Sequence, residues 1–370
     1  GGEQAPLFMQ STGGLTAASV FRGKDAILSG PAGGIVGMAQ TSERAGFDRV
    51  IGFDMGGTST DVSLYAGRYE RDSETIVAGT RIRTPMLRIH TVAAGGGSVC
   101  RFEAGRFVVG PESAGAVPGP ACYRRGGPLT VTDCNLILGK LHPDAFPSVF
   151  GADGDEPLDR DATDQRMAEL LAAIARETGK DMSPEDAATG FVSIAVAGMA
   201  NAIRTVSVAR GHDVTRFALA CFGGAGGQHA CLVADALGIE HIVVHPLSGV
   251  LSAYGMGLAD RREVREASLG VAVGDGAAID VAADMLRNDA HAALVAQGVE
   301  ASTVRIEVEA HIRAGASDSI IEVPLADEAS MRAGFAAGHR RRFGYATDAA
   351  LVIDRLRVDA ISATDTPTLP

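Results

Sequence analysis

An apolar run that ends in an aspartate and a Gly-Gly-Thr turn constrains the fold of this chain more than any other feature. Residues 50–53 lead into Asp54, and a second strand-like run, residues 62–65, leaves after the turn. This arrangement predicts a β-hairpin whose tip presents backbone N–H groups, a hydroxyl and a carboxylate. Because glycine lets a ligand approach the backbone and successive N–H groups bind anions, such a tip is suited to nucleotide phosphates.

Within the turn, we expect Gly56, Gly57 and Thr58 to cradle the β- and γ-phosphates of a nucleotide. Asp54 would then lie beside a Mg²⁺ ion, which proteins hold through carboxylates and water. The alternative is a plain hairpin turn in which Asp54 and Thr58 satisfy local N–H groups. Other segments of the chain decide between these two interpretations.

Length and composition indicate a globular protein with room for two domains. The chain has 370 residues, of which 46% are hydrophobic and 21% charged. Its formal net charge of -12 argues against a nucleic-acid partner. Five cysteines without a CxxC pair favour reduced thiols and a cytoplasmic location. No apolar run reaches about 18 residues, so we expect no membrane span, and no signal peptide is visible.

Three glycine-rich segments accompany the hairpin. Residues 30–37 and 249–257 each begin a helix of small residues, and two such helices can cross closely. Between them, a strand at 217–222 leads through a glycine turn into a helix. That turn could let adenosine lie on the backbone; its residues are Gly223, Gly224, Ala225 and Gly226. Taken alone, each segment is more often plain packing.

Hydrophobic periodicity outlines the remaining elements. A strand is expected at 26–28, and residues 66–150 are rich in glycine and proline, with short strands and no long helix. Asp159 or Asp161 caps one predicted helix, and a longer one starts at Pro184. After Asp260 the predicted order is βαββαβ, that of a ferredoxin-like α+β unit. We therefore expect domains at 1–260 and 261–370.

Together, the hairpin, the glycine turn and the two small-residue helices resemble the second lobe of the actin-like (ribonuclease H-like) ATPase superfamily. Residues 89–98, 109–141 and 211–231 are similar to the hydantoinase A/oxoprolinase family, in particular its ATP-dependent 5-oxoprolinase branch. The segment FGGAGGQHAC at 222–231 carries that distinction. The stretch 313–318 departs from the family's usual pattern, which puts any role for that loop in doubt.

The resemblance implies an α/β enzyme that uses ATP and Mg²⁺ to open a cyclic amide. In such enzymes the amide oxygen is phosphorylated and the activated ring is hydrolysed, so 5-oxo-L-proline would yield L-glutamate, ADP and phosphate. Phosphorylation turns the oxygen of an unreactive lactam into a leaving group. No second DxGGT hairpin occurs in the chain. The resemblance thus implies a missing N-terminal lobe and a hydantoinase B-like domain or subunit as partners, and we expect a homo-oligomer.

Two further residues are candidates for catalysis. Asp133 is a candidate acid–base group or metal partner, and the alternative is a turn or helix N-cap. His90 lies near the glycines of 95–97, and the alternative is a packed, hydrogen-bonded histidine. Residues 93–98 and 109–135 would line the substrate side.

Several charged and sulfur-bearing residues have simpler interpretations. Arg83 and Arg88 could meet a phosphate or a carboxylate, or could be solvated surface charge. His229 suits a capping or nucleotide-edge contact rather than catalysis. Cys221 and Cys231 fit small buried apolar residues. The arginines at 340–342 fit the solvated end of a helix.

Alternative functions stay open at this point. A hydantoin hydrolase or a carboxylase subunit would keep the fold and change the substrate. A non-catalytic ATP-binding module would use the same phosphate hairpin without chemistry.

Overall fold

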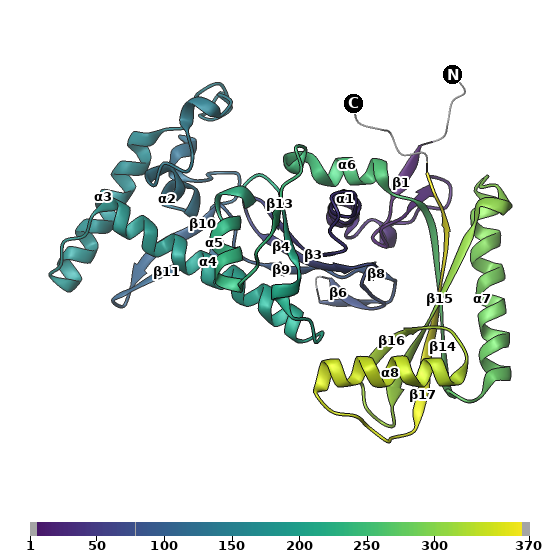
Figure 1. The fold of residues 1–370 in the computed structure, drawn as a ribbon. Coiled ribbons are helices and arrows are strands. Elements are labelled where there is room, and N and C mark those ends of the chain that lie inside the picture. Colours follow the sequence, from purple (N-terminus) through teal and green to yellow (C-terminus); the bar gives the residue numbers. More distant parts are fainter. Residues whose placement is uncertain (1–5, 78, 365–370) are drawn as a thin grey trace.

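A computed structural model describes residues 6–77 and 79–364 of the chain. At its centre lies a five-stranded sheet with the order β13-β12-β3-β4-β9 (Figure 1). Its strands are β3 (Arg49–Met55), β4 (Thr60–Ala66), β9 (His90–Val92), β12 (Ala218–Phe222) and β13 (Ile242–Val243). β3 and β4 form the predicted antiparallel hairpin, while β12 runs parallel to β3.

Helices cover both faces of this sheet. Alternating residues of β3 divide between two cores: Ile51 and Phe53 pack with α4 (Pro184–Val208) and α5 (Ala230–Leu237). Val50 faces the opposite core, with α1 (Ser29–Arg44) and α6 (Leu251–Leu258). This two-sided burial is the expected consequence of the period of two along a strand. It makes the five-stranded sheet the rigid platform for the hairpin tip.

The two small-residue helices cross backbone to backbone, as predicted. A Cβ atom added to Gly255 of α6 would lie 1.9 Å from the carbonyl oxygen of Gly33 in α1. A Cβ on Gly37 would lie 2.7 Å from the carbonyl oxygen of Leu251. Only glycine at these positions permits the observed approach.

Two helix signals are confirmed, whereas the strand expected at 26–28 is wrong. Asp159 caps α3 (Arg160–Thr178) by accepting from the Ala162 N–H, and Ser183 caps α4. Residues 26–28 instead form a turn after the 3₁₀ helix Gly23–Asp25. The N–H of Ala26 donates to Gly23 and that of Leu28 to the Ser11 hydroxyl, so local partners satisfy this backbone.

The glycine-rich region contains short strands and one short helix. Its elements are β5 (Arg71–Asp72), β6 (Thr75–Val77), β7 (Thr80–Ile82), β8 (Met86–Leu87), β10 (Ser98–Glu103), β11 (Arg106–Ser113) and α2 (Val131–Ile137). Phe107 of β11 packs on Phe191 of α4 with ring centroids 4.6 Å apart. Figure 1 shows α2, α3, β10 and β11 at one end of the molecule.

Helix α4 is, among the described residues, the one helix long and apolar enough to cross a membrane. Core helices of soluble proteins meet the same criterion. Phe191, Met199 and Ile203 of α4 are fully buried within the core that faces the central sheet. Packing on that sheet accounts for the apolar composition of the helix.

The C-terminal region has the predicted βαββαβ order but a different sheet topology. Its elements are β14 (Arg261–Ala272), α7 (Gly276–Ala296), β15 (Arg305–Ala314), β16 (Ile320–Pro324), α8 (Glu328–Phe343) and β17 (Leu351–Ser362). A ferredoxin-like unit places its third strand between the first two. Here the last strand, β17, lies between β14 and β15, and β16 is at the edge. The ten-pair ladders of β17 with both neighbours fix this order.

Chain segments from the two ends of the sequence meet in this second sheet. The N-terminal strands β1 (Leu7–Met9) and β2 (Leu15–Ala17) extend it through a bridge between Leu15 and Arg261. Its separate hydrophobic core includes Leu286, Ile353 and Leu356.

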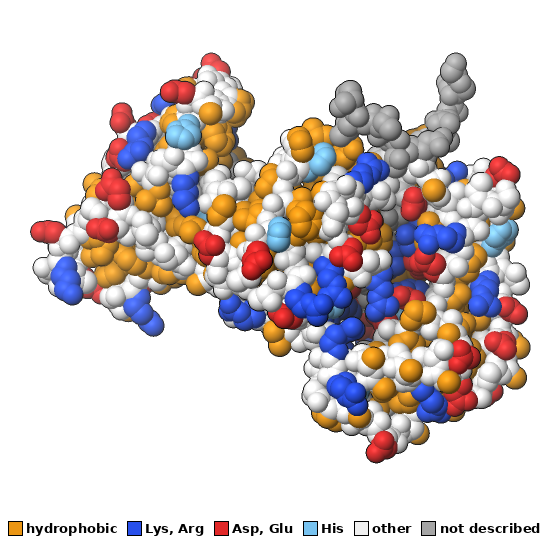
Figure 2. All heavy atoms as spheres, viewed as in Figure 1, with side chains coloured by type: hydrophobic (Ala, Val, Ile, Leu, Met, Phe, Trp, Pro, Cys, Tyr) orange, Lys and Arg blue, Asp and Glu red, His pale blue; other side chains and the backbone are white. Residues whose placement is uncertain are grey.

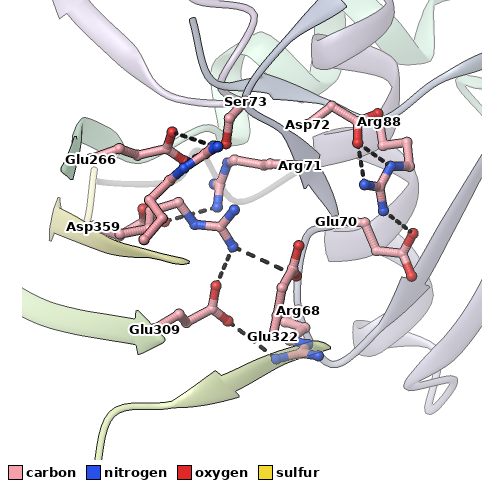
Figure 3. Close-up of polar contacts among 12 residues, drawn as sticks. Arg68, Glu70, Arg71, Asp72, Ser73, Arg88, Glu266, Glu309, Glu322 and Asp359 are labelled. Atoms are coloured by element: carbon pink, nitrogen blue, oxygen red, sulfur yellow. Dashed lines mark hydrogen bonds and ion pairs between the residues drawn. The ribbon is translucent and has the colours of Figure 1, made fainter. Parts of the chain in front are cut away.

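Ion pairs connect the C-terminal sheet to residues 68–73 (Figure 3). Asp359 of β17 accepts from Arg71 at 2.8 Å and from Arg262 at 2.6 Å, and all three side chains are buried. Arg68 reaches Glu309 of β15 at 3.2 Å, and the Ser73 hydroxyl donates to Glu266 at 2.8 Å. Charged contacts therefore fix the C-terminal region against the segment 68–73, which follows the hairpin.

Candidate functional site

The tip of the β3–β4 hairpin is exposed and open. The Gly56 N–H donates to the Ser59 carbonyl at 3.1 Å and closes the turn. Gly57 and Thr58 are exposed, and their N–H groups have no backbone acceptor among the described residues. An added Cβ at Gly56 or Gly57 would meet nothing within 4 Å. The tip thus has the free donors and the open space that an anion cradle needs.

A second glycine loop supports the tip from beside it. The N–H of Gly96 donates to the Gly56 carbonyl at 3.1 Å, and that of Gly97 to Gly57 at 2.6 Å. A Cβ on Gly95 would lie 2.6 Å from the carbonyl carbon of Thr58. Residues 95–97 therefore hold the carbonyl side of the tip and leave its N–H side free.

Two carboxylates face one another at the base of the tip. Asp54 and Asp61 are directly paired across β3 and β4, so their side chains share one face of the sheet. Burial, and then the charge of Asp61, raise the pKa of Asp54 to about 6. The Asp61 carboxylate accepts from the Thr91 hydroxyl at 2.6 Å. Sequence reasoning missed Asp61, although positions 54 and 61 are symmetric about the Gly57–Thr58 turn.

These carboxylates fit a Mg²⁺ ion. Mg²⁺ is commonly held by one or two carboxylates, with waters and substrate phosphates completing its shell. Among the described residues, no group of three or more His, Cys, Asp or Glu side chains forms a metal-binding cluster. Asp54 and Asp61 would therefore supply the protein's share, and a cation between them would relieve the repulsion that raises the pKa of Asp54.

The predicted adenosine turn lies against Asp54. Gly223 has φ +81°, and a Cβ there would lie 2.5 Å from Asp54 Oδ1 and from the Met55 carbonyl oxygen. The Ala225 N–H donates to Met55 at 2.9 Å, whereas Gly224 is exposed with open space around it. Gly226 is buried, and its added Cβ would lie 2.9 Å from Cys221 Sγ. The fold thus places the two glycine segments side by side, as the sequence motifs predicted.

The crossing of the two small-residue helices, α1 and α6, also lies close to Asp54. A Cβ on Gly34 of α1 would lie 2.9 Å from the Ser252 hydroxyl oxygen and 3.6 Å from Asp54 Oδ2. The carboxylate, the glycine turn and the helix crossing therefore form one contiguous site.

The surroundings of Asp133 do not support the acid–base role that the sequence suggested. It is fully buried, and its two oxygens accept five hydrogen bonds, from the N–H groups of Thr130, Ala121 and Cys122 and from the hydroxyls of Thr130 and Thr163. Thr130 and Asp133 form the capping box of α2. A carboxylate with this many donors organises its loops and has no oxygen free for proton transfer.

His90 is not brought to the carboxylates. It pairs with Val62, so it lies on the face of the sheet opposite Asp54 and Asp61. Its side chain is exposed, which also makes the packed-histidine alternative wrong. The structure therefore gives the predicted catalytic role of His90 no geometric support.

The remaining candidates hold structural positions. Arg83 pairs with Glu74 at 3.2 Å, and Arg88 binds Asp72, so neither reaches the hairpin tip. His229 is buried beside Asn135 with 3.0 Å between Nε2 and Nδ2, and burial, with nearby Lys140, lowers its pKa to about 4. Cys221 is buried as expected, but Cys231 is exposed.

Comparison with known proteins places this geometry in a family. Residues 2–265 match the family model described as Hydantoinase/oxoprolinase. The chain belongs to this family. It is 44% identical over 358 residues to 5-oxoprolinase PfmaA from Pestalotiopsis fici, covering 95% of this chain and 28% of that protein. It is 54% identical over 261 residues to 5-oxoprolinase 1 from Arabidopsis thaliana, covering 69% and 21%.

A solved structure shares nearly the whole fold. The ATP-dependent caprolactamase from Pseudomonas jessenii aligns with a TM-score of 0.87 at 31% identity, over 99% of this chain and 54% of that one. The mixed α/β fold of this hydantoinase/oxoprolinase family member is therefore similar to that of the caprolactamase. The chain spans less than a third of the length of these two 5-oxoprolinases.

Proposed function

We propose that this chain forms one wall of the ATP site in an enzyme that hydrolyses a cyclic amide. The single observation that carries this proposal is the hairpin tip, where free N–H groups, paired carboxylates and the Gly223 turn meet. The family match and the relatives named 5-oxoprolinase support 5-oxo-L-proline as the substrate, with L-glutamate, ADP and phosphate as products.

The roles of the residues follow from their positions. Gly57 and Thr58 would donate backbone N–H groups to the β- and γ-phosphates, and Asp54 with Asp61 would hold Mg²⁺. Gly224 and Ala225 would support adenosine on their backbone. The charge on the transferring phosphoryl group would be stabilised mainly by this fixed positioning.

On this proposal, residues 1–260 correspond to an actin-like second lobe and 261–370 to an appended α+β domain. The opposite wall of the nucleotide cleft would come from an N-terminal lobe, and a hydantoinase B-like part would complete the amide site. The crossing of α1 and α6 and the hairpin beside the glycine turn support the actin-like assignment. A homo-oligomer in the cytoplasm is the expected setting.

The test measures ADP release from Mg-ATP by the complete gene product, with its partner subunit where one exists. We expect strong stimulation by 5-oxo-L-proline, with one glutamate formed for each ADP. Asp54→Asn should lower this turnover by about 10²-fold or more, because it removes charge where Mg²⁺ and phosphate meet. Asp48→Asn, exposed near the other end of β3, is the matched control and should leave turnover unchanged.

Other outcomes redirect the proposal. Turnover stimulated by a hydantoin or by caprolactam, and not by 5-oxo-L-proline, would replace the substrate and keep the ATP site. Nucleotide binding with no turnover on any cyclic amide would favour a non-catalytic module. Unchanged turnover in Asp54→Asn would remove Asp54 from the site.

A further inference from the structure

A cleft of about 900 Å³ separates the central sheet from the C-terminal region, and the hairpin site does not use it. Nine arginines line it: Arg49, Arg68, Arg71, Arg88, Arg210, Arg216, Arg341, Arg342 and Arg355. Figure 2 shows Lys and Arg side chains gathered where the two regions meet. Such a concentration is unexpected in a chain with a formal net charge of -12.

Five of these arginines already have carboxylate partners. Arg68, Arg71 and Arg355 pair with acids of the C-terminal sheet. Arg88 and Arg210 share Glu70, and Arg88 also binds Asp72. These pairs shape the wall of the cleft and leave their charges compensated.

The other four have no carboxylate partner among the residues that the structure describes: Arg49, Arg216, Arg341 and Arg342. Arg49 begins β3, and Arg216 lies just before β12, the parallel neighbour of β3. Arg341 and Arg342 come from the last turn of α8. Four positive charges from three elements thus converge on one cavity.

A close backbone contact sets the position of the α8 end. Gly211, with φ +69°, lies so near that an added Cβ would be 2.5 Å from the Arg341 carbonyl oxygen. This backbone contact places the end of α8 opposite Arg49 and Arg216, and the Arg342 guanidinium also donates to the Ile320 carbonyl at 3.1 Å. Arg340 and Arg341 are exposed at the helix end, as the sequence predicted, and Arg341 and Arg342 in addition line the cleft.

Six acids line the cleft: Glu70, Asp72, Glu74, Asp213, Asp318 and Glu322. None of these six described acids forms an ion pair with the four arginines, although hydrogen bonds from Thr215 and then the charge of Arg216 lower the pKa of Asp213. Glu322 lies 3.9 Å from Arg357. Glu70 and Asp72 are taken by the paired arginines, and Glu74 by Arg81 and Arg83. Asp213 accepts from the N–H and hydroxyl of Thr215.

Two buried nitrogens in the wall also lack partners among the described residues. They are Nη2 of Arg71 and Nε2 of His311, whose side chains are each about 4% exposed. An unpaired buried donor is costly, so polar groups of this kind usually have an acceptor or a water.

From this convergence we propose that the cleft binds a small multivalent oxyanion, a phosphate ester or a polycarboxylate, that bridges the two regions. Guanidinium groups bind both kinds of anion through paired N–H donors. The cleft lies beside Arg49 at the start of β3, whereas the nucleotide hairpin lies beyond Met55 at its end. Six residues of strand separate them by roughly 20 Å, at about 3.4 Å per residue. The ligand is therefore an effector, distinct from the ATP phosphates.

The test is calorimetric titration of the complete gene product at low ionic strength, with inorganic tripolyphosphate and with citrate as probes. Arg216→Gln and Arg341→Gln should each weaken binding about ten-fold or more. Arg340→Gln is the matched control, because it removes the same charge from the same helix end outside the cleft. It should change the affinity less than about two-fold, because the charge that it removes lies outside the cleft and its attraction for the ligand is screened by water and salt. These residues are exposed, so the variants should keep the wild-type melting temperature.

The outcomes separate clearly. Binding of tripolyphosphate alone identifies a phosphate ester, and comparable binding of citrate identifies a polycarboxylate. The proposal is overturned if neither probe binds, if Arg216→Gln and Arg341→Gln bind as wild type, or if Arg340→Gln loses as much affinity as Arg341→Gln.

Discussion

The crossing of α1 and α6 and the contact between residues 68–73 and the C-terminal sheet join parts of one chain by opposite means. At the helix crossing, Gly33, Gly37 and Gly255 bring bare backbone into contact. At the second contact, Arg71, Arg262 and Asp359 bring charges together in a buried network. The first depends on the absence of a side chain at three positions, and the second depends on charged side chains.

This difference predicts how each contact fails. A steric contact has no tolerance for added volume, but it is indifferent to pH and salt. A buried charge network tolerates volume better, but it fails when one partner loses its charge. The helix crossing lies beside Asp54, so the proposed nucleotide site is built next to the contact that pH and salt affect less.

The largest effect is expected from Gly255→Ala. The new methyl group would lie 1.9 Å from the Gly33 carbonyl oxygen, so the two helices must separate. We expect a loss of at least about 3 kcal/mol in the free energy of unfolding, measured by urea denaturation. Gly257→Ala on the same helix is the control, because its Cβ would meet nothing within 4 Å. Equal stability of the two variants would show that the crossing is not backbone-limited.

Asp359→Asn should have the next largest effect. It leaves two guanidinium groups buried without their shared carboxylate, at a cost of about 3 kcal/mol. Asp354→Asn is the control on the same strand, because the partner of Asp354, Arg313, lies 3.4 Å away in a half-exposed pair. Chemical denaturation, with hydrogen exchange of β14 and β17, measures both.

The pH dependence of this effect has a defined sign. Burial alone would raise the pKa of Asp359, but the guanidinium groups of Arg71 and Arg262 lower it below 3.8. Its stabilisation is therefore complete above the unfolded pKa and is lost as pH falls through the folded one. The stability difference between wild type and Asp359→Asn should therefore begin to shrink as pH falls below about 4 and should vanish only below the lowered pKa of Asp359. A constant difference down to strongly acidic pH would contradict the charge network.

Those parts of the candidate site that depend on residues close together in the sequence could be predicted. The hairpin with its Gly-Gly-Thr tip and the glycine turn each follow from residues that are neighbours along the chain. The structure places these two segments together. Asp133 was ambiguous because Thr130 and Asp133 fit a capping box as well as an acid–base site. Only the burial and the donors from Ala121 and Thr163 separate the two.

Long-range pairing could not be predicted in the same way. The βαββαβ order was visible from periodicity, but the insertion of β17 between β14 and β15 depends on which strands meet in space. The Arg71–Asp359 pair joins residues 288 positions apart, and no local pattern identifies it. Arg341 and Arg342 acquire significance only through the Gly211 contact, which the sequence does not reveal.

Asp54→Asn tests the carboxylate beside the helix crossing, and this substitution should stabilise the protein. Burial and the charge of Asp61 raise the pKa of Asp54 to about 6, so ionisation above that pH costs folding free energy. The variant should gain on the order of 1 kcal/mol at pH 8, allowing for solvent screening of a partly exposed group. Below about pH 4, where both forms are neutral, the gain should vanish. Thermal unfolding across this range measures it, and destabilisation at pH 8 would contradict the prediction.

Arg68→Gln should have the smallest effect, although Arg68, like Arg71, pairs with an acid of the C-terminal sheet. Its side chain is 46% exposed, and its contact with Glu309 is 3.2 Å long, so water and salt screen the pair. Glu309 also keeps Arg357 as a second partner, so the substitution leaves no buried charge alone. We expect a loss of no more than about 0.5 kcal/mol, which disappears in high salt. Denaturation of Arg68→Gln and Asp359→Asn at low and high salt checks this directly. A salt-independent loss as large as that of Asp359→Asn would mean that the rim of the contact, rather than its buried centre, holds the two regions together.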